Sequence, residues 1–488
     1  MKKLKVSIIS PNLSGCCSIL DIGVTCLATF INERTDHKAN VLDYTFKVKE
    51  WKEYLKRKLD EFKPDVIGIT TTSLFMRYVR MTIDEIRKNY SSTVPIVLGG
   101  YHTTLNSESA IQEKGVNVII HGEGEFIMAD YLNALAEGKS LDNITGLWYK
   151  KDGQVFKNPK RPWIEDIDSL PIPNYDLWED IDKYFFFIGQ LWFMGTRGCP
   201  FKCTNCSEEP MTRALPGRRF RMRDPQGYVK EIKHQWLKYK DRGFRMAHPF
   251  DAVFTVNEPW VKEFCDEYKK EGLVGKLPFS VFTHGATSQE DKVKMLAEVG
   301  CKEVRIGIES GSERVRNEIY GKHATTEQIR QAFKNFRKYG INTIAYNMLG
   351  GPTEAKKELW ETYDLNKEVD PNKPIFFIFR PLPGTDIIGM VDGLGEEIDA
   401  AAMSHEIDTL HWGAALKSKN RSENYVEYFQ LRCFAYFVSR RIWRLVKKQK
   451  IRFFINFVKY MSRAAKYKLD MRIAFAYFLA SCGDNLFS

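Results

Sequence analysis

Short apolar strands alternate with amphipathic helical segments along most of this 488-residue chain, and this alternation constrains its fold more than any other feature. Strands that alternate with helices pair in parallel, and the helices then cover both faces of the sheet. Ligands of such sheets bind in loops at the carboxyl ends of the strands. For residues 1–150 the pattern predicts strands over Val6–Ser10, Asn40–Tyr44, Asp65–Thr70, Pro95–Gly99 and Val116–His121, and helices over Leu20–Glu33, Trp51–Glu61 and Leu74–Tyr90.

The pattern is interrupted over residues 146–190 and then resumes. Asp152-Gly153 favours a hairpin turn, and Pro171-Ile172-Pro173 disfavours helix, so we predict a connector here. From Leu191 onward a second βα series predicts a partial barrel with its active site at the carboxyl ends of the strands. Its predicted strands are Leu191–Gly195, Gly243–Ala247, Phe279–Thr283, Glu303–Ile308, Thr343–Leu349 and Pro374–Phe379, and its predicted helices are Asp224–Tyr239, Glu258–Lys270, Gln289–Glu298, Thr326–Tyr339 and Glu354–Val369.

Composition and charge bear on the compartment of the protein. No apolar run approaches the roughly 18 residues of a spanning helix. The N-terminal residues alternate over a short apolar run, which indicates a first strand and not a signal peptide. We therefore expect a cytoplasmic protein, in which clustered cysteines favour metal over disulfide. Of the net charge of +11, the twelve Lys/Arg and one Asp between Arg440 and Arg472 account for 12 − 1 = 11, so the rest of the chain is close to neutral.

Three cysteines, Cys199, Cys203 and Cys206, lie in one predicted loop after the first strand of the second series. Structural zinc takes four ligands, commonly from two separated pairs. The nearest other cysteines, Cys265 and Cys301, fall on a predicted helix and before a later strand. The spacing therefore favours an iron–sulfur cluster with one iron left open. A zinc loop completed by histidine, or three structural thiols, remains an alternative.

Several segments resemble the radical S-adenosylmethionine (SAM) superfamily. Residues 192–206, WFMGTRGCPFKCTNC, resemble its cysteine loop, and residues 301–312, CKEVRIGIESGS, resemble its fourth-strand segment. Further matches cover residues 243–256, 347–354 and 379–385. The resemblance implies a [4Fe–4S] cluster and SAM, with cleavage of SAM to a 5′-deoxyadenosyl radical. Carried over by position, it implies that Cys199, Cys203 and Cys206 bind the cluster, and that Glu309, Ser310, Asp251 and Glu354 lie near SAM.

Residues 1–140 resemble the cobalamin-binding domain that precedes the core in one subfamily. The matching segments are residues 65–72 (DVIGITTT), 95–103 (PIVLGGYHT) and 121–125 (HGEGE). Small residues in these loops allow a broad corrin ring to approach the backbone. The subfamily's Asp-x-His-x-x-Gly motif is absent, so we expect either cobalamin without a histidine below the cobalt or a domain that has lost cobalamin. The resemblance implies a cofactor-binding set of Thr71, Thr72, Ser73, Gly99, Gly100, His102, Gly122, Glu123 and Gly124.

Together these features predict an α/β protein of four regions. They are a doubly wound, Rossmann-like cobalamin-binding domain (1–145), a connector (146–190), a partial (β/α)6 radical SAM core (191–385) and a C-terminal helical region (386–488). The resemblance implies methyl transfer from methylcobalamin to an unactivated carbon of a small-molecule, lipid or peptide substrate. It also implies an external reductant of the flavodoxin or ferredoxin kind. The alternatives are oxidative cyclisation or rearrangement on the same scaffold, and a non-catalytic iron–sulfur sensor.

The C-terminal segment from Tyr436 to Tyr467 interleaves aromatic residues with Lys and Arg. Such a segment caps a domain with its aromatic residues turned inward, or lies on an anionic membrane surface. Phosphate contacts and base stacking would instead suit nucleic acid, which we rank last. The sequence leaves the helical cap and peripheral membrane contact both open.

Overall fold

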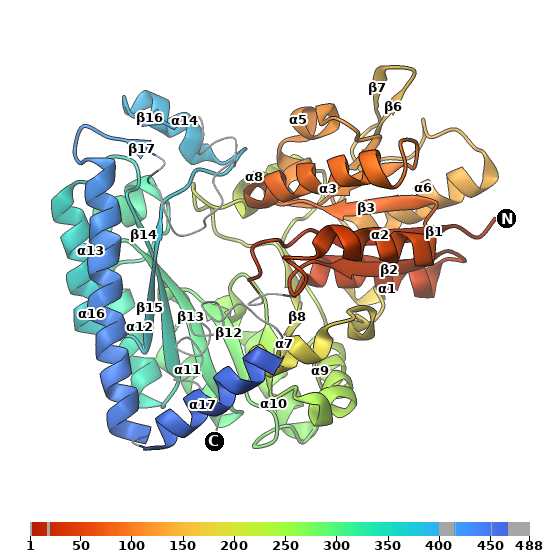
Figure 1. Ribbon diagram of the computed structural model, residues 1–488. Helices are drawn as coiled ribbons and strands as arrows, with labels where there is room; N and C mark the ends of the chain where they lie inside the picture. Colours follow the sequence, from red (N-terminus) through yellow and green to blue (C-terminus); the bar gives the residue numbers. More distant parts are fainter. Residues whose placement is uncertain (1, 17–19, 400–413, 415, 450, 467–488) are drawn as a thin grey trace.

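The computed structural model describes residues 2–16, 20–399, 414, 416–449 and 451–466. It places two α/β domains side by side, with C-terminal helices packed on the second (Figure 1). The predicted helices over residues 467–488 lie outside the described residues. No helix in the described ranges is both long and apolar enough to cross a bilayer.

The N-terminal domain contains a seven-stranded sheet in the order β2-β1-β3-β4-β5-β6-β7. The first five of these strands pair in parallel, as predicted, whereas the hairpin around Asp152-Gly153 adds β6 and β7 in antiparallel fashion. The predicted connector therefore begins with two strands of this sheet. The strands are β1 (Lys5–Ser10), β2 (Lys38–Asp43), β3 (Val66–Thr70), β4 (Ile96–Gly99), β5 (Val118–Ile120), β6 (Leu147–Lys151) and β7 (Gln154–Lys157), and the helices are α1 (Ile22–Arg34), α2 (Trp51–Phe62), α3 (Met76–Asn89), α4 (Tyr101–Leu105), α5 (Ser107–Gln112) and α6 (Gly124–Glu137).

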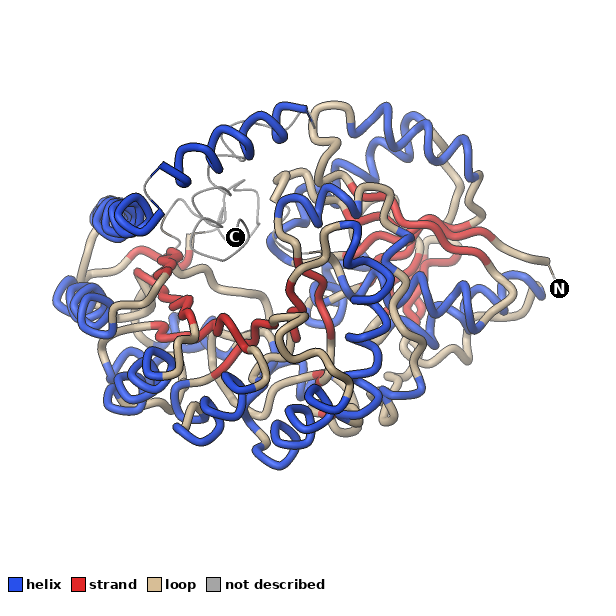
Figure 2. The backbone as a smooth tube through the Cα atoms, turned by 90° about the horizontal axis from the view of Figure 1, so that it is seen from below, coloured by secondary structure: helices blue, strands red, loops and turns tan. Residues whose placement is uncertain are grey.

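The second domain is a six-stranded parallel sheet in the order β15-β14-β13-β12-β11-β8, curved with its helices outside (Figure 2). Because β8 and β15 lie at opposite edges and do not pair, the barrel is partial, as predicted. Its strands are β8 (Gln190–Phe193), β11 (Met246–Pro249), β12 (Phe279–Thr283), β13 (Cys301–Glu309), β14 (Asn342–Leu349) and β15 (Lys373–Ile378), and its helices are α9 (Pro225–Tyr239), α10 (Glu258–Lys270), α11 (Glu290–Glu298), α12 (Thr326–Lys338) and α13 (Lys356–Val369).

Local sequence explains where these elements start. Thr325 and Gln328 form a capping box at the start of α12, and the Asn257 side chain caps α10. One predicted strand was placed wrongly: residues 243–247 were expected to pair, but β11 begins at Met246. Gly243 adopts a left-handed conformation with φ of 104°, which ends the preceding helical turn and delays the strand.

Shorter elements join and extend the two domains. Among its described residues the C-terminal region is mainly helical, and these residues also contain one short antiparallel strand pair. Its long helix packs on β15, and the following helix continues from it. The remaining elements are α7 (Ile181–Phe187), β9 (Thr196–Arg197), α8 (Glu208–Ala214), β10 (Arg221–Met222), α14 (Asp386–Gly393), β16 (Glu397–Ile398), β17 (Leu416–Lys417), α16 (Glu423–Gln449) and α17 (Ile451–Lys466).

Candidate cofactor site

The three predicted cluster ligands lie in the loop between β9 and α8, at the carboxyl end of β8. All three thiols are free and partly exposed. Gly198 shapes the entry to the loop: its φ is 90°, and a Cβ there would lie 2.6 Å from the Arg219 carbonyl oxygen. Within the loop, the Thr204 backbone N–H donates to the Tyr320 carbonyl oxygen at 3.0 Å. The fold therefore fixes the loop at its entry and at its middle.

The cysteine loop fits a cluster with an open iron better than it fits a single metal ion. Among the residues described, no group of three His, Cys, Asp or Glu converges in the way that one ion requires. A zinc ion draws its sulfurs to about 2.3 Å from one point, whereas the cysteines of a cubane each bind a different iron. Cys265, Cys301 and Cys433 are buried in the core, so none of these three supplies a fourth thiolate.

Burial keeps these thiols protonated when no metal is bound. It raises the pKa of Cys199 and Cys203 to about 11 and that of Cys206 to about 12. The Lys322 ammonium acts on all three in the opposite direction, so it lies close enough to stabilise thiolates. Because cluster ligation requires thiolates, we expect assembly to release protons.

Lys322 pairs with Glu309 beside the cysteine loop, and sequence reasoning identified only the glutamate. Lys322 Nζ lies 2.7 Å from Glu309 Oε1, and both side chains are less than one-fifth exposed. Gly307 leaves room for the pair, since a Cβ there would meet Glu309 Oε1 at 2.1 Å. Glu309 itself has a φ of 63°, a strained value for a non-glycine residue. The Gly-Ile-Glu segment thus holds a charged pair beside the cysteine loop.

The inner face of the barrel beneath this pair is aromatic. The rings of Phe282 and Tyr346 stack with their centroids 6.3 Å apart, and those of Tyr346 and Phe377 stack at 6.1 Å. These inward side chains keep part of their surface accessible, while Ile306 and Ile308 on the opposite face of β13 are fully buried. Side chains therefore do not fill the interior as they do in a closed barrel.

Ser310 and Glu354 are buried and hydrogen-bonded to each other. Both are fully buried, and the Ser310 hydroxyl donates to Glu354 Oε1 at 3.3 Å. Glu354 Oε2 accepts from the backbone N–H of Gly350 at 2.6 Å. These bonds tie the loop after β13 to the loop after β14. A contact of either residue with SAM stays a prediction.

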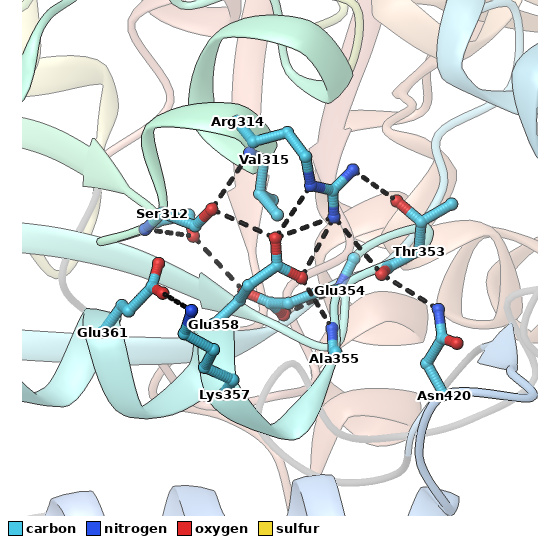
Figure 3. Close-up of polar contacts among 12 residues, drawn as sticks. Ser312, Arg314, Val315, Thr353, Glu354, Ala355, Lys357, Glu358, Glu361 and Asn420 are labelled. Atoms are coloured by element: carbon cyan, nitrogen blue, oxygen red, sulfur yellow. Dashed lines mark hydrogen bonds and ion pairs between the residues drawn. The ribbon is translucent and has the colours of Figure 1, made fainter.

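A neighbouring ion pair reinforces the same junction (Figure 3). Arg314 donates to both carboxylate oxygens of Glu358, at 2.8 and 3.0 Å. The same carboxylate accepts from the Ser312 hydroxyl and the Ala355 backbone N–H, and Arg314 also donates to Thr353. The start of α13 is therefore fixed to the loop that carries Glu309 and Ser310.

Asp251 follows β11 as predicted and is fully buried. Its carboxylate accepts from the backbone N–H and the hydroxyl of Thr196, three residues before Cys199. Tyr228 donates to its other oxygen at 3.4 Å. Asp251 thus positions the strand that leads into the cysteine loop, and a contact with SAM stays a prediction here too.

Replacing Asp251 with asparagine should change how stability depends on pH. Burial raises the pKa of this carboxyl from 3.8 to about 7. The native state therefore favours the protonated carboxyl. The contribution of this preference to the free energy of unfolding is lost as the pH rises through 7. Asparagine is neutral and can still accept the Thr196 bonds. The free energy of unfolding of Asp251→Asn, relative to that of the wild type, should therefore rise by about 3 kcal/mol between pH 5 and pH 8. Urea unfolding across this range measures the difference, and a pH-independent difference would refute the assignment.

The predicted corrin loops lie at the carboxyl edge of the N-terminal sheet. A Cβ on Gly99 would meet no atom within 4 Å, so this position faces open space. Gly100 has a φ of 111° and packs against the Thr71 carbonyl oxygen. Ser73 Oγ lies 2.9 Å from Nδ1 of His102, which is buried. Together with exposed Thr72, these residues form a ledge that a flat, broad ligand can cover.

The loop after β5 contacts the second domain and helix α1. A Cβ on Gly122 would lie 2.5 Å from Leu215 of the second domain, and one on Gly124 would contact Leu27. Glu123 Oε1 lies 2.8 Å from Arg197 Nη1, and Glu123 Oε2 lies 2.8 Å from Arg221 Nη1. These three residues thus face protein in this structure, and a corrin contact stays a prediction for them.

Glu123, Glu125, Arg197 and Arg221 form one buried ion-pair network between the domains. Arg197 and Arg221 lie opposite each other across β9 and β10, where their like charges would repel. Glu123 bridges both, and Glu125 accepts from Arg197 Nη2 at 2.6 Å. Burial alone would raise the pKa of Glu123, but Arg221 and Arg197 lower it to about 2. Sequence reasoning missed both arginines, although Arg197 precedes Gly198-Cys199 directly.

A second interdomain contact holds the other end of the cysteine loop. Glu208, two residues after Cys206, accepts from the Tyr101 hydroxyl of the N-terminal domain. Arg219 Nη2 lies 3.0 Å from Glu208 Oε2, and its guanidinium lies 4.5 Å from the Trp163 ring centroid. The N-terminal domain therefore contacts this loop at Arg197, two residues before Cys199, and at Glu208, two residues after Cys206.

Comparison with known families agrees with this geometry. The family model described as the radical SAM superfamily matches residues 194–365, which span the cysteine loop and the strands around it. The chain therefore contains a radical SAM domain. The model described as the B12 binding domain matches residues 18–132. The predicted radical SAM and cobalamin-binding domains and the fold class are thereby confirmed, whereas bound cofactors, the domain boundaries and individual site residues stay predictions.

Three known proteins are similar to this chain over most of its length. An uncharacterised methyltransferase of Pyrococcus horikoshii is 29% identical, with 89% of this chain and 88% of the relative covered. The anaerobic magnesium-protoporphyrin IX monomethyl ester cyclase of Rubrivivax gelatinosus is 26% identical over 71% of this chain and 61% of the relative. The structure of the methyltransferase TsrM from Kitasatospora setae, with cobalamin and a [4Fe-4S] cluster bound, has a TM-score of 0.69 at 20% identity, covering 82% and 81% of the two chains.

Proposed function

We propose that this radical SAM protein is a cobalamin-dependent methyltransferase that methylates an unactivated carbon of a small-molecule substrate. The proposal rests on two contacts of the N-terminal domain with the ends of the cysteine loop, one at Arg197 and one at Glu208. They bring the carboxyl edges of the two sheets together, so ligands bound at each edge would face one another. The methyltransferases among the similar proteins support this reading.

The protein's own residues would bind, orient and shield the reactants. Cys199, Cys203 and Cys206 would hold the cluster, and Lys322 with Glu309 would meet the charged amino-acid end of SAM. Gly99, Gly100 and Thr72 would carry the corrin. When bound, the cluster supplies the electron that cleaves SAM, and cobalamin carries the methyl group. Holding all reactants in one cleft converts their encounter into a positioned, water-poor reaction.

Product mass distinguishes methyl transfer from its main rival. The cyclase similarity favours oxidative cyclisation or rearrangement as the second candidate function. The loaded enzyme is supplied with candidate substrates and with SAM whose methyl group is deuterated. Methyl transfer then adds one deuterated methyl group to the product. A product that retains its carbon count would support the cyclase reading. A cluster that binds without forming any 5′-deoxyadenosine would support a sensor.

Cobalamin binding can be tested without turnover by filling the ledge at Gly99. Gly99→Leu should leave stability nearly unchanged, because the added side chain enters open space. It should weaken hydroxocobalamin binding by roughly tenfold or more, since a bulky residue keeps the ring off the backbone. Gly389→Leu, at an equally open position on α14, is the matched control. Spectroscopic titration measures both, and unchanged affinity in Gly99→Leu would place the corrin elsewhere.

The remaining partner assignments belong to the same proposal. An electron donor of the flavodoxin or ferredoxin kind would reduce the cluster, and the protein would act in the cytoplasm. Lipids and peptides stay open as substrate classes beside other small molecules. The basic C-terminal helices would bring the enzyme to a membrane surface.

A further inference from the structure

The two C-terminal helices α16 and α17 have apolar residues on two opposite faces. On α16, Val426, Phe429, Cys433 and Phe437 are buried. Phe437 packs on Phe376 of β15, with ring centroids 5.4 Å apart. This face accounts for the attachment of α16 to the barrel. A surface helix of a globular protein normally carries polar residues on the side facing away.

The outward side of α16 is instead apolar along its length. Tyr428, Leu431, Ala435, Val438 and Ile442 recur at spacings of three and four residues, which places them on one face. The first three are exposed, and Val438 and Ile442 are partly exposed. This stripe lies opposite the buried face, so packing among the residues described does not explain it.

Helix α17 repeats this arrangement as it turns away from the end of α16 (Figure 1). Tyr460 and Ala464 are buried, and Tyr460 stacks on Phe186 of α7 at 5.4 Å. Phe454, Ile455 and Val458 face outward. The helix therefore spans from the outer edge of the barrel toward α7, and Ile455 and Val458 on its other side are 46% and 64% exposed.

These two helices hold the most exposed apolar side chains among the residues described. Tyr428, Phe434, Trp443, Phe454 and Val458 are 57–64% exposed, ahead of Leu237 on α9 at 51%. Exposed apolar residues gathered in this way mark an interaction site, whereas scattered single ones need no explanation.

Charge decides which partner fits. Ten Lys/Arg and no Asp or Glu lie between Arg440 and Lys466, and two of these cations, Arg440 and Arg444, pair with Asp370 at the end of α13. Lys447 and Lys459 are exposed beside the apolar residues, and Lys447 lies 4.9 Å from the Trp443 ring centroid. A second copy of the chain would present the same cations and be repelled. Anionic lipid head groups attract them, while aromatic side chains enter the interfacial layer.

We propose that the outward faces of α16 and α17 form a docking surface for an anionic lipid bilayer. The helices lie on the membrane and do not cross it, which agrees with the absence of a spanning helix among the residues described. The proposal stands apart from the chemistry of the site, because it requires neither cluster nor cobalamin. Its failure would leave the proposed methyl transfer untouched.

Vesicle flotation of the full-length protein tests this surface. Wild type should float with phosphatidylcholine–phosphatidylglycerol vesicles at least tenfold more tightly than with phosphatidylcholine alone, and less so at high salt. Lys447→Glu/Lys459→Glu should weaken this binding by at least tenfold, since each cation near the surface contributes about fivefold. Phe434→Gln/Val458→Gln should also weaken it by roughly tenfold, because both side chains would lose their burial in the interface.

The matched control is Leu237→Gln, an exposed apolar position on α9, and it should bind as the wild type does. Circular dichroism of each variant checks that the fold is intact. Absence of vesicle binding, or binding that the Phe434→Gln/Val458→Gln pair leaves unchanged, would overturn the proposal. A concentration-dependent dimer that this pair abolishes would assign the surface to a second copy and would overturn it too.

Discussion

Cys203→Ala is expected to abolish SAM cleavage while the protein remains folded. The cysteine loop supplies three thiols and, among the residues described, the core cysteines Cys265, Cys301 and Cys433 cannot replace one that is lost. A cluster held by two thiolates would be released or degraded during anaerobic reconstitution. Iron and sulfide content should fall to background, and 5′-deoxyadenosine formation should fall with it.

Cys265→Ala is the control for loss of a thiol as such. Cys265 lies on α10 and is 2% exposed, so its removal costs some core packing but leaves the loop intact. This variant should assemble a full cluster. If Cys203→Ala retained full iron, sulfide and SAM cleavage, the ligand assignment would be wrong.

Arg197→Met is expected to lower the free energy of unfolding by about 3–5 kcal/mol, because it leaves a buried carboxylate uncompensated. Arg197 lies between Glu123 and Glu125 with its side chain 11% exposed, and Glu125 is 7% exposed. The change should also loosen the contact between the domains, so the single urea transition should broaden or split. Urea unfolding followed by circular dichroism measures both effects.

Two further variants separate a buried network from ordinary surface pairing. Arg330→Met removes an ion pair with Glu368 whose members are 43% and 51% exposed, and it should cost less than about 1 kcal/mol. Arg197→Met/Glu125→Leu removes the uncompensated charge and should recover part of the loss. If Arg197→Met cost no more than Arg330→Met, the network would not join the domains.

The hydrophobic periodicity of the sequence and its turn-forming residues were enough to predict the two sheets. Helix α10 was placed to the residue, because Asn257 and Pro259 mark its start and an apolar face runs through it. The cysteine loop could be located from the spacing of its three cysteines, although the spacing left a zinc loop or structural thiols as alternatives. Strand β11 was shifted, since the conformation of Gly243 depends on the helical turn that it ends.

What the sequence could not reveal were partners distant in the chain. Nothing near Glu123 indicates that Arg221 lies across from it, 98 residues later. Lys322 follows a loop with no motif of its own, yet it reaches Glu309 and the cysteines. Ser310 and Glu354 belong to recognisable segments, but their burial against each other emerges only when two adjacent strands are placed side by side.

Anaerobic reconstitution tests the central claim most directly. The protein is loaded with iron, sulfide and hydroxocobalamin, desalted, and then supplied with SAM and a low-potential reductant. We expect a bound [4Fe–4S] cluster, retained cobalamin and 5′-deoxyadenosine formed only when both SAM and reductant are present. A protein that retains no iron and sulfide, or whose cluster leaves SAM intact, would contradict the account.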